Sequence, residues 1–353
     1  MSFYRTAVFG IKGFNEYTRS GYEAAAKKFN PTDTDVDMSD QHIMITGANS
    51  GIGKIAALEC AKRHAHVYMV CRDEKRGKEA QEEIIRESNN HHVELHLCDM
   101  SKPQDVFAFT KQFVDSKKPL NVLCNNSGCM INERQMVNDE HEANFATNTL
   151  GTYILTKNLV PVLLENQPAR VFTTSSGGMY NVKLDPDDFN STQMRTFSGD
   201  LVYAQNKRQQ VVMAERLAVR HPSIFFASWH PGWADTPALR SSMPSFHSKI
   251  QNRLRTPEQG ADTLVWLCCL KDIAEKFKNG DFFQDRAPVS KHLPLAWTKS
   301  TVDEDERFMR NLDRQTNSFD AIKFEKFSKV KKIPFTVMTN KIFYRNNKVE
   351  YTK

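Results

Sequence analysis

The stretch Thr46-Gly47-Ala48-Asn49-Ser50-Gly51-Ile52-Gly53-Lys54 joins a short apolar run to a helical pattern, and it decides how this chain folds. Gly47 suits a tight turn, Gly51 lets the backbone approach a pyrophosphate, and Gly53 lets the helix pack closely on the preceding strand. The open amides at the N-terminus of that helix would face the same anion. A glycine loop alone is weak evidence, because turns use glycine freely. Its place directly after a buried strand is what predicts a dinucleotide-binding loop.

Short β-rich runs alternate with helical stretches around this loop. Strands are predicted at 42–46, 67–71, 93–98, 122–125, 171–174 and 224–229, and residues 281–284 could add a last one. Helices are predicted at 53–64, 75–88, 103–117, 139–165 and 201–220. The strands are continuous apolar runs, which indicates burial on both faces. The pattern predicts an α/β fold, a Rossmann-type doubly wound parallel sheet of three layers with right-handed crossovers.

This pattern spans residues 41–300, which we expect to form one domain with an extension at each end. The first extension, residues 1–40, carries apolar groups at the spacing of an amphipathic helix, at Tyr4, Val8, Ile11 and Phe14. That helix could dock on its own domain, contact a membrane surface or serve targeting. Residues 30–40 then form a linker.

The second extension, residues 301–353, is expected to hold a helix that starts at Thr301 and ends near Gln315, followed by a basic tail. The tail explains the formal charge of +6, because residues 321–353 hold nine Lys or Arg against two Glu. The rest of the chain has 39 basic and 40 acidic residues. It shows no basic helix interleaved with aromatic residues, so we expect no nucleic-acid partner.

The number of cysteines and the hydropathy of the chain limit where in the cell the protein can be expected. Seven cysteines, an odd number in a chain of 353 residues, argue against a disulfide framework and for a reducing environment. No apolar run approaches the roughly 18–20 residues of a membrane span. We therefore expect a cytoplasmic protein, with peripheral membrane contact through the N-terminal segment or the basic tail as an open alternative.

The end of the second predicted strand bears on cofactor choice. A carboxylate at this place would bind both ribose hydroxyls of NAD, whereas an arginine would bind a 2′-phosphate. Cys71 stands where the carboxylate is expected, and Arg72 follows it. Lys54 could add positive charge nearby. NADP(H) is therefore favoured, while Asp73 keeps NAD(H) open.

Tyr203-Ala204-Gln205-Asn206-Lys207 opens a predicted helix, and its spacing places the phenol and the ammonium on one helical face. A neighbouring cation favours the phenolate, so the pKa of Tyr203 is predicted to fall toward the range that a general acid or base needs. A Tyr-x-x-x-Lys pair also arises by chance on a surface. Ser176 after the fifth strand and Asn148 in the helix before it make chance a poor explanation.

Together these motifs resemble the short-chain dehydrogenase/reductase family. The resemblance rests on the loop 46–53, on Pro231-Gly232 followed by Thr236, and on further matches at Asp99, Asn125-Asn126-Ser127-Gly128, Asn148, Ser176, Tyr203 and Lys207. Two positions depart from the pattern. Ser127 stands where the family usually has alanine, and Asn206 replaces the common serine before the lysine.

The resemblance implies an NAD(P)(H)-dependent oxidoreductase that acts on CH–OH groups without a metal. Tyr203 would transfer the proton, Lys207 would lower its pKa and hold the nicotinamide ribose, Ser176 would bind the substrate oxygen, and Asn148 would fix a water that relays protons to Lys207. The implied cofactor-binding residues are Gly47, Asn49, Ser50, Gly51, Ile52, Gly53, Arg72, Asp99, Asn126, Tyr203, Lys207 and Thr236.

The substrate is expected to be a lipophilic ketone, aldehyde or alcohol. The long insertion between Ser176 and Tyr203 should border the site, and it contains Met179, Tyr180, Leu184, Phe189, Met194 and Phe197. The segment after Pro231 adds Trp233, Leu239, Met243 and Phe246. A nucleotide-binding regulator or scaffold on the same fold is the alternative, and a homo-oligomer remains open.

Two other groupings could suggest different chemistry. Cys124 and Cys129 lack His or Cys partners at zinc spacing, so they are interpreted as buried thiols. Asp185, Asp187 and Asp188 resemble a paired-carboxylate site, but their polar surroundings beside Pro186 place them in a solvent loop.

Overall fold

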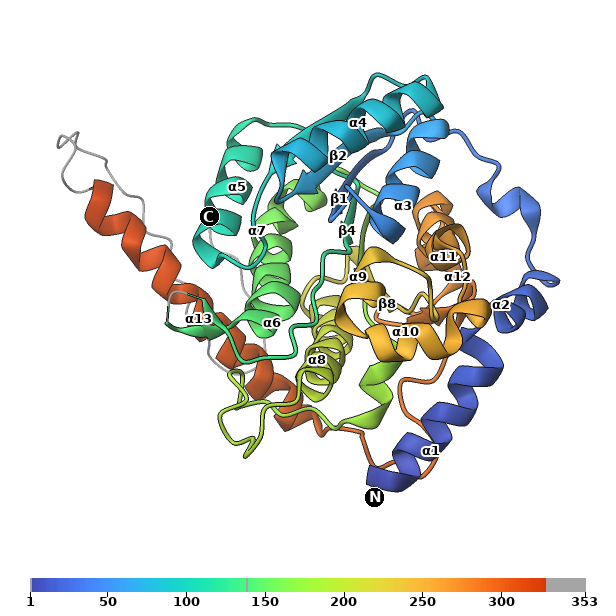
Figure 1. The fold of residues 1–353 in the computed structure, drawn as a ribbon. Helices are drawn as coiled ribbons and strands as arrows, with labels where there is room; N and C mark the ends of the chain where they lie inside the picture. Colours follow the sequence, from blue (N-terminus) through green and yellow to red (C-terminus); the bar gives the residue numbers. More distant parts are fainter. Residues whose placement is uncertain (1, 138, 328–353) are drawn as a thin grey trace.

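The computed structural model describes residues 2–137 and 139–327 and shows a central sheet between two layers of helices (Figure 1). The strand order is β10-β9-β8-β7-β4-β1-β2-β3, and every neighbouring pair is parallel except β10 with β9. The doubly wound fold predicted from the sequence is confirmed. The strands are β1 (His42–Thr46), β2 (His66–Cys71), β3 (Val93–Leu97), β4 (Val122–Asn125), β7 (Ala169–Thr174), β8 (Ile224–Trp229), β9 (Phe282–Gln284) and β10 (Ala287–Pro288).

One apolar core lies on each face of the sheet, because the inner strands are apolar on both sides. One face is covered by α3 (Gly51–Lys62), α4 (Glu74–Ser88) and α11 (Pro257–Cys269). The other is covered by α5 (Pro103–Asp115), α7 (Thr152–Glu165) and α8 (Gly199–Arg220). No helix in the described part of the chain is long and apolar enough to cross a bilayer.

The predicted helix 139–165 begins later than expected and is not regular. Two short strands, β5 (Met136–Val137) and β6 (His141–Glu142), form a hairpin before it. The Glu142 carboxylate then accepts from the Phe145 N–H at 3.0 Å and caps α6 (Ala143–Phe145). The π-helical turn η3 (Ala146–Gly151) connects α6 to α7. The prediction missed the hairpin because two-residue strands leave no alternating pattern.

The C-terminal helix α13 (Val302–Phe327) starts where predicted but continues well past Gln315. It packs beside α8 and α5, and Phe308, Met309 and Leu312 are fully buried against the domain. Its capping box at Thr301 and Glu304 is present, as the sequence indicates. These docked residues lie before Gln315, within the part of the helix that the sequence predicts. The basic tail from residue 328 onward lies outside the described residues.

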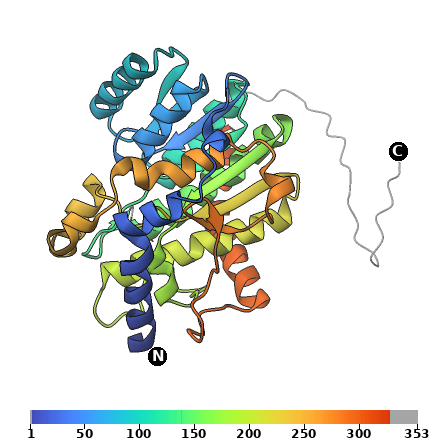
Figure 2. The same ribbon diagram turned by 90° about the vertical axis from the view of Figure 1, so that its right-hand side faces the viewer.

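The N-terminal extension is docked on the domain, the first of the three alternatives. It forms α1 (Ser2–Lys12), the π-helical turn η1 (Gly13–Tyr17) and α2 (Arg19–Ala26). In Figure 2, α1 stands at the lower edge of the molecule. The remaining short helices are η2 (Pro31–Thr34), η4 (Gly177–Asn181), α9 (Pro237–Ser242), α10 (Pro244–Ile250), η5 (Gln251–Arg253) and α12 (Ile273–Lys276).

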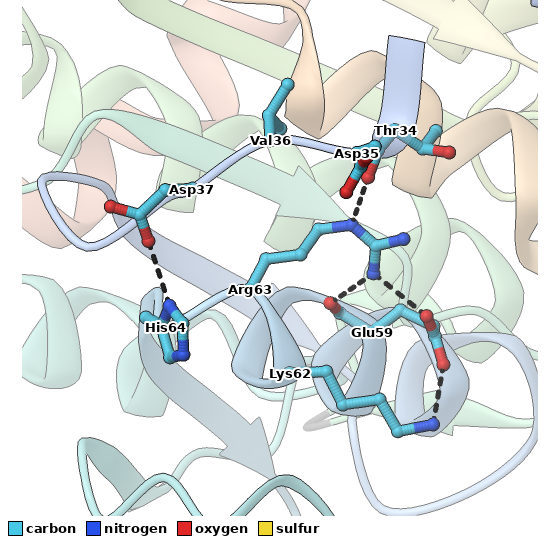
Figure 3. A pocket seen from close by; sticks show the side chains of 8 residues that line it. All are labelled: Thr34, Asp35, Val36, Asp37, Glu59, Lys62, Arg63 and His64. Carbon is cyan, nitrogen blue, oxygen red and sulfur yellow. Dashed lines mark hydrogen bonds and ion pairs between the residues drawn. The ribbon is translucent and has the colours of Figure 1, made fainter. Parts of the chain in front are cut away.

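The segment expected to be a linker, residues 30–40, is tied to the domain. It contains η2, and Met38 within it is 1% exposed. Arg63 donates to the Thr34 carbonyl at 2.6 Å and to the Glu59 carbonyl at 2.6 Å, and His64 pairs with Asp37 at 2.9 Å (Figure 3). These groups line a hollow of about 610 Å³. Because Arg63 and His64 bond to residues 34 and 37 across this hollow, we interpret it as the place where the segment is attached to the domain.

Candidate active site

A cavity of about 760 Å³ lies where the carboxyl ends of the parallel strands meet. Loops that follow β1, β2, β3, β4, β7 and β8 all contribute to it, as expected of a ligand site in an open α/β sheet. Of the site residues predicted from the sequence, only Asn148 does not line this cavity. Those that line it are Gly47, Asn49, Ser50, Gly51, Ile52, Gly53, Arg72, Asp99, Asn126, Ser176, Tyr203, Lys207 and Thr236.

The glycine loop after β1 is shaped by its glycines. Gly47 and Gly51 have φ values of +68° and +53°, which L side chains rarely adopt. A Cβ on Gly53 would lie 2.4 Å from the Gly47 carbonyl oxygen and 2.5 Å from Asn126 Nδ2. The loop after β4 is held beside it, because Thr46 Oγ1 accepts from the backbone N–H of Asn126 at 2.9 Å. The helix α3 begins at Gly51 and points its N-terminus into the cavity.

The end of β2 brings two arginines to the cavity. Arg72 is exposed and has no ion-pair partner within residues 2–137 and 139–327. Arg76, which the sequence interpretation missed, also lines the cavity and pairs with Asp73 at 3.4 Å. The Arg76 N–H donates to Asp73, which is the largest cause of the lowered pKa of that carboxyl. Arg72 is thus the cation left free for an anion.

Lys54 does not contribute charge to the cavity in the way the sequence suggested. Its ammonium pairs with Glu83 on α4, and the residue is not among those that line the cavity. Lys54 lies on the first turn of α3, and the side chain leans toward the neighbouring helix rather than toward the loop. Any 2′-phosphate contact therefore depends on the two arginines that follow β2.

Tyr203, Lys207 and Ser176 meet on one wall of the cavity. Tyr203 and Lys207 come from the first two turns of α8, and Ser176 follows β7. The Lys207 ammonium donates to the Thr174 carbonyl at 2.7 Å and lies 5.3 Å from the centre of the Tyr203 ring. A Cβ on Gly128 would lie 3.4 Å from Lys207 Nζ, so the loop after β4 passes directly over the ammonium.

Burial governs the titration of this wall in a way that the sequence did not predict. It raises the pKa of Tyr203 to about 12, although a hydrogen bond with Ser176 opposes the shift. It also lowers the pKa of Lys207 to about 8. The expectation that Lys207 brings the pKa of Tyr203 below its ordinary value is therefore wrong, because desolvation of the phenolate by burial is the largest cause of the shift and raises that pKa.

The N-terminal segment forms part of the cavity wall, which the sequence interpretation did not foresee. Phe9 of α1 lines the cavity. The Trp233 N–H donates to the Tyr17 carbonyl at 2.8 Å. A Cβ on Gly13 would lie 2.4 Å from the Trp233 ring, so η1 and the segment after β8 are in direct contact. This wall of the cavity is therefore built jointly by the N-terminal segment and by the segment that follows β8.

The buried Arg255 side chain holds η1 against the loop that follows β8. It is 1% exposed and forms a two-bond ion pair with Asp285, at 2.6 and 2.9 Å. It also donates to the carbonyls of Glu16 at 2.6 Å and Tyr17 at 3.1 Å. A third carbonyl contact reaches Pro231 at 3.2 Å. One buried guanidinium thus ties the N-terminal segment to the loop that follows β8.

His230 joins the loops on either side of the cavity. Its Nδ1 accepts from the backbone N–H of Gly177 at 3.1 Å and of Gly232 at 3.4 Å. Burial lowers the pKa of His230 well below its usual range, so the ring is neutral and carries its proton on Nε2. The Tyr17 ring packs edge-on against it with centroids 4.2 Å apart. His230 is therefore a positioning residue for the Ser176 loop.

The part of the cavity beyond Ser176 and Tyr203, here called the substrate end, is apolar. Only one of the two segments expected to line it supplies the predicted side chains. Within the insertion 177–200, Met179, Tyr180, Leu184 and Phe189 are buried in the cores and do not line the cavity. The segment after Pro231 does supply its predicted side chains. The apolar lining includes Phe9, Met130, Ile131, Met136, Val137, Leu201, Trp233, Leu239, Met243 and Phe246.

The cysteine pair and the aspartate cluster considered in the sequence do not come together as a metal or acid–base site. Cys124 lies within the sheet core with its sulfur 3.5 Å from that of Cys268, and all seven cysteines are free thiols. Cys129 lines the cavity with a raised thiol pKa caused by burial. Asp187 pairs with Arg307, and Asp188 accepts from Thr192 in a surface loop. Neither grouping forms a metal or paired-carboxylate site.

Comparisons with known proteins agree with this geometry. A family model for short chain dehydrogenases matches residues 41–184. The human protein named dehydrogenase/reductase SDR family member 12 is 50% identical over 319 residues, which cover 90% of this chain and 100% of that protein. The chain belongs to the short-chain dehydrogenase/reductase family. Human retinol dehydrogenase 11 is 31% identical over 71% of this chain and 79% of its own.

Solved structures of short-chain dehydrogenases share the fold. One from Escherichia coli CFT073, complexed with NADPH, has a TM-score of 0.57 and 21% identity, and covers 73% of this chain and 100% of its own. A 3-ketoacyl-(acyl-carrier-protein) reductase from Brucella melitensis, complexed with NADH, has a TM-score of 0.53 and 24% identity over 69% and 95%. Membership in the family makes this protein an oxidoreductase with a nicotinamide-nucleotide fold.

Asn148, the fourth residue of the short-chain dehydrogenase/reductase pattern, lies behind the cavity wall and is fully buried. Its side chain exchanges two hydrogen bonds of 2.8 Å with the backbone of Cys129 and donates to Asn206 at 3.1 Å. Asn206, which replaces the usual serine, thus links α8 to the π-helical turn η3. The backbone carbonyl of Asn148 accepts from Gln210 Nε2 at 2.6 Å, so a second side chain of α8 bonds to η3 at this residue.

Proposed function

We propose that the protein reduces a lipophilic ketone or aldehyde to the alcohol with NADPH, and oxidises the alcohol in reverse. The observation that carries this proposal is one cavity lined by the glycine loop, the free Arg72 and the Tyr203–Lys207–Ser176 wall. The retinol dehydrogenase and the NADPH-bound dehydrogenase among its relatives support the substrate class and the cofactor. NADH stays the weaker alternative, as the reductase complexed with NADH illustrates.

The cavity residues fit a dinucleotide. The glycine loop and the N-terminus of α3 would hold the pyrophosphate, and Arg72 with Arg76 would hold a 2′-phosphate. Asn126, after β4, and Asp99, after β3, line the cavity on either side of these groups along the strand ends. The bound nicotinamide supplies a hydride to the carbonyl carbon. The chain's own residues would then orient the carbonyl and supply the proton that completes the alcohol.

Ser176 would donate a hydrogen bond to the carbonyl oxygen, and Tyr203 would transfer its proton to that oxygen as negative charge develops there. With a pKa of about 12, Tyr203 is protonated throughout the neutral range and is ready to act as the acid. Lys207 would stabilise the tyrosinate that remains and hold the ribose. Asn148 would fix a water that relays protons to Lys207.

The deciding experiment measures NADPH consumption with a panel of lipophilic ketones and aldehydes, for the wild type and Tyr203→Phe. Wild-type turnover of at least one carbonyl is expected, with loss on the order of 10²–10⁴ in the variant. Isothermal titration should show equal NADPH affinity for both proteins. Tight NADPH binding without turnover of any carbonyl would instead support a nucleotide-binding regulator or scaffold.

A further inference from the structure

The helix α1 and the turn η1 that follows it carry an exposed apolar stripe. Phe3 is 87% exposed, Ile11 65% and Phe14 47%, and Ala7 lies exposed between them. Residues 3, 7, 11 and 14 recur at helical spacing and therefore share one face. The opposite face holds Phe9, which lines the cavity. Docking on the domain thus uses only half of the amphipathic helix and leaves its other apolar half outside.

A second apolar pair lies beside the start of this stripe. Leu295 is 74% exposed and Trp297 71%, whereas Ala296 between them is fully buried. Both exposed residues have left-handed backbones, with φ of +54° and +52°. This conformation is unfavourable for bulky L residues, yet it turns a leucine and a tryptophan into solvent. The outward position of both side chains is thus set by the backbone of this loop.

Hydrogen bonds fix the pair against α1. Arg5 donates to the Ala296 carbonyl at 2.7 Å and to the Trp297 carbonyl at 3.3 Å. The Tyr4 hydroxyl donates to the Pro294 carbonyl at 3.0 Å. The two apolar groups are therefore parts of one surface, which we define as Phe3, Ala7, Ile11, Phe14, Leu295 and Trp297 and call the apolar ridge. Figure 2 shows α1 at the lower edge of the molecule.

The chain around the apolar ridge is cationic. The three segments that build it and its surroundings, residues 2–15, 236–257 and 287–302, contain eight Lys or Arg and no Asp or Glu. Several of these cations are held by the protein itself, such as Arg255 with Asp285. Lys249, Arg253 and Lys299 form no ion pair within the described part of the chain. Arg253 lies over the Phe14 ring at 5.9 Å, so one of them adjoins the ridge directly.

The ridge also leads to the cavity. The Phe14 ring packs edge-on against Trp233 with centroids 5.4 Å apart, and Trp233 packs against Phe246 at 5.1 Å. Both Trp233 and Phe246 line the substrate end of the cavity. A surface that receives the ridge would therefore lie next to the apolar lining, and a lipophilic molecule could pass between them without crossing bulk water.

We propose that the apolar ridge docks on the surface of an anionic phospholipid bilayer. Aromatic and aliphatic side chains of an amphipathic helix insert at the headgroup boundary, and nearby lysines and arginines add attraction to anionic lipids. The charge pattern argues against a second copy of the chain as the occupant. A two-fold contact would bring Lys249, Arg253 and Lys299 of one copy, which form no ion pair among the described residues, close to the same cations of the other, and this is unfavourable. The proposal concerns the place where the enzyme works and does not depend on the reaction proposed above.

Vesicle flotation of the full chain tests the proposal without any substrate. The vesicles contain phosphatidylcholine alone, or phosphatidylcholine with roughly a quarter phosphatidylserine. The wild type should float with the anionic vesicles. Ile11→Glu and Trp297→Glu should each bind about tenfold or more weakly, because each places a charge where an apolar side chain enters the lipid. Val219→Glu is the matched control, since Val219 is 66% exposed on α8 away from the ridge, and it should bind like the wild type.

Charge and folding are tested separately. Lys249→Glu with Arg253→Glu should remove the preference for anionic vesicles, and circular dichroism with NADPH titration should show that every variant is folded. Equal binding of Ile11→Glu, Trp297→Glu and wild type would overturn the proposal, because the ridge would then play no part. If the protein bound neutral vesicles as strongly as anionic ones, the proposal that the bilayer must be anionic would be wrong. Sedimentation that shows a wild-type dimer, monomeric Ile11→Glu and no vesicle binding would assign the ridge to self-association.

Discussion

The two ends of the cavity are built in different ways. The nucleotide end uses loops that each follow a parallel strand, so its residues lie at one edge of the sheet as soon as the sheet forms. The substrate end joins Phe9 of α1 to Trp233 and Phe246, which are more than 200 positions away in the sequence. The first end depends on local motifs, and the second depends on docking of distant segments. They should therefore respond differently to substitution.

The largest effects are expected where the two ends meet. Lys207→Ala should reduce turnover on the order of 10²–10⁴ and also weaken NADPH binding, because the ammonium has a role at the tyrosine and at the ribose. Tyr203→Phe should reduce turnover by a similar factor but leave NADPH affinity intact. Steady-state kinetics and calorimetric titration measure both. Equal loss of NADPH affinity in the two variants would show that the proton donor has been assigned wrongly.

Arg72→Asp tests the nucleotide end alone. It removes a charge-assisted contact worth roughly 1.5–3 kcal/mol and repels a 2′-phosphate, so the preference for NADPH over NADH should fall at least tenfold. The Michaelis constant for the carbonyl should stay near the wild-type value. Arg76→Asp is the companion variant. A ratio of affinities unchanged in Arg72→Asp but reduced in Arg76→Asp would transfer the phosphate contact to Arg76.

Two glycine substitutions set the two ends against each other. A Cβ at Gly53 meets backbone and amide atoms of the nucleotide end, whereas a Cβ at Gly13 meets the Trp233 ring. Overpacking of this kind costs about 1–3 kcal/mol. Gly53→Ala should weaken NADPH binding, and Gly13→Ala should raise the Michaelis constant for the carbonyl. If both variants changed the same constant, the two ends would be coupled and the contrast between them would fail.

The pH dependence should give the smallest change. Burial holds the pKa of Lys207 at about 8, so its ammonium is present below that pH and is lost as the pH rises through it. The value of kcat/KM for reduction should be flat near neutrality and fall above about pH 8. Tyr203 cannot cause this fall, because its pKa of about 12 keeps it protonated. A midpoint near 10 would mean that Lys207 titrates as an ordinary lysine.

The same contrast explains how far the sequence could be interpreted. The parallel sheet, the glycine loop and the placement of Arg72, Ser176 and Tyr203 on one cavity follow from short motifs at strand ends. The role of Phe9, the lock formed by Arg255 and the burial of Met179 do not, because they depend on contacts across most of the chain. The pKa of Tyr203 was mispredicted for a related reason. Spacing shows which charge is near, but only the packed structure shows how much water has been removed.

The lock formed by Arg255 has a consequence for synthesis of the chain. The N-terminal segment is synthesised before its partners, because the Arg255 guanidinium that holds it and the carboxylate of Asp285 follow more than 200 residues later. At translation rates of roughly 5–20 residues per second, about ten seconds to a minute passes before that partner exists. During this interval both apolar halves of α1 are open to chaperones or to a lipid surface. The segment can thus meet a membrane before the enzyme that it completes has folded.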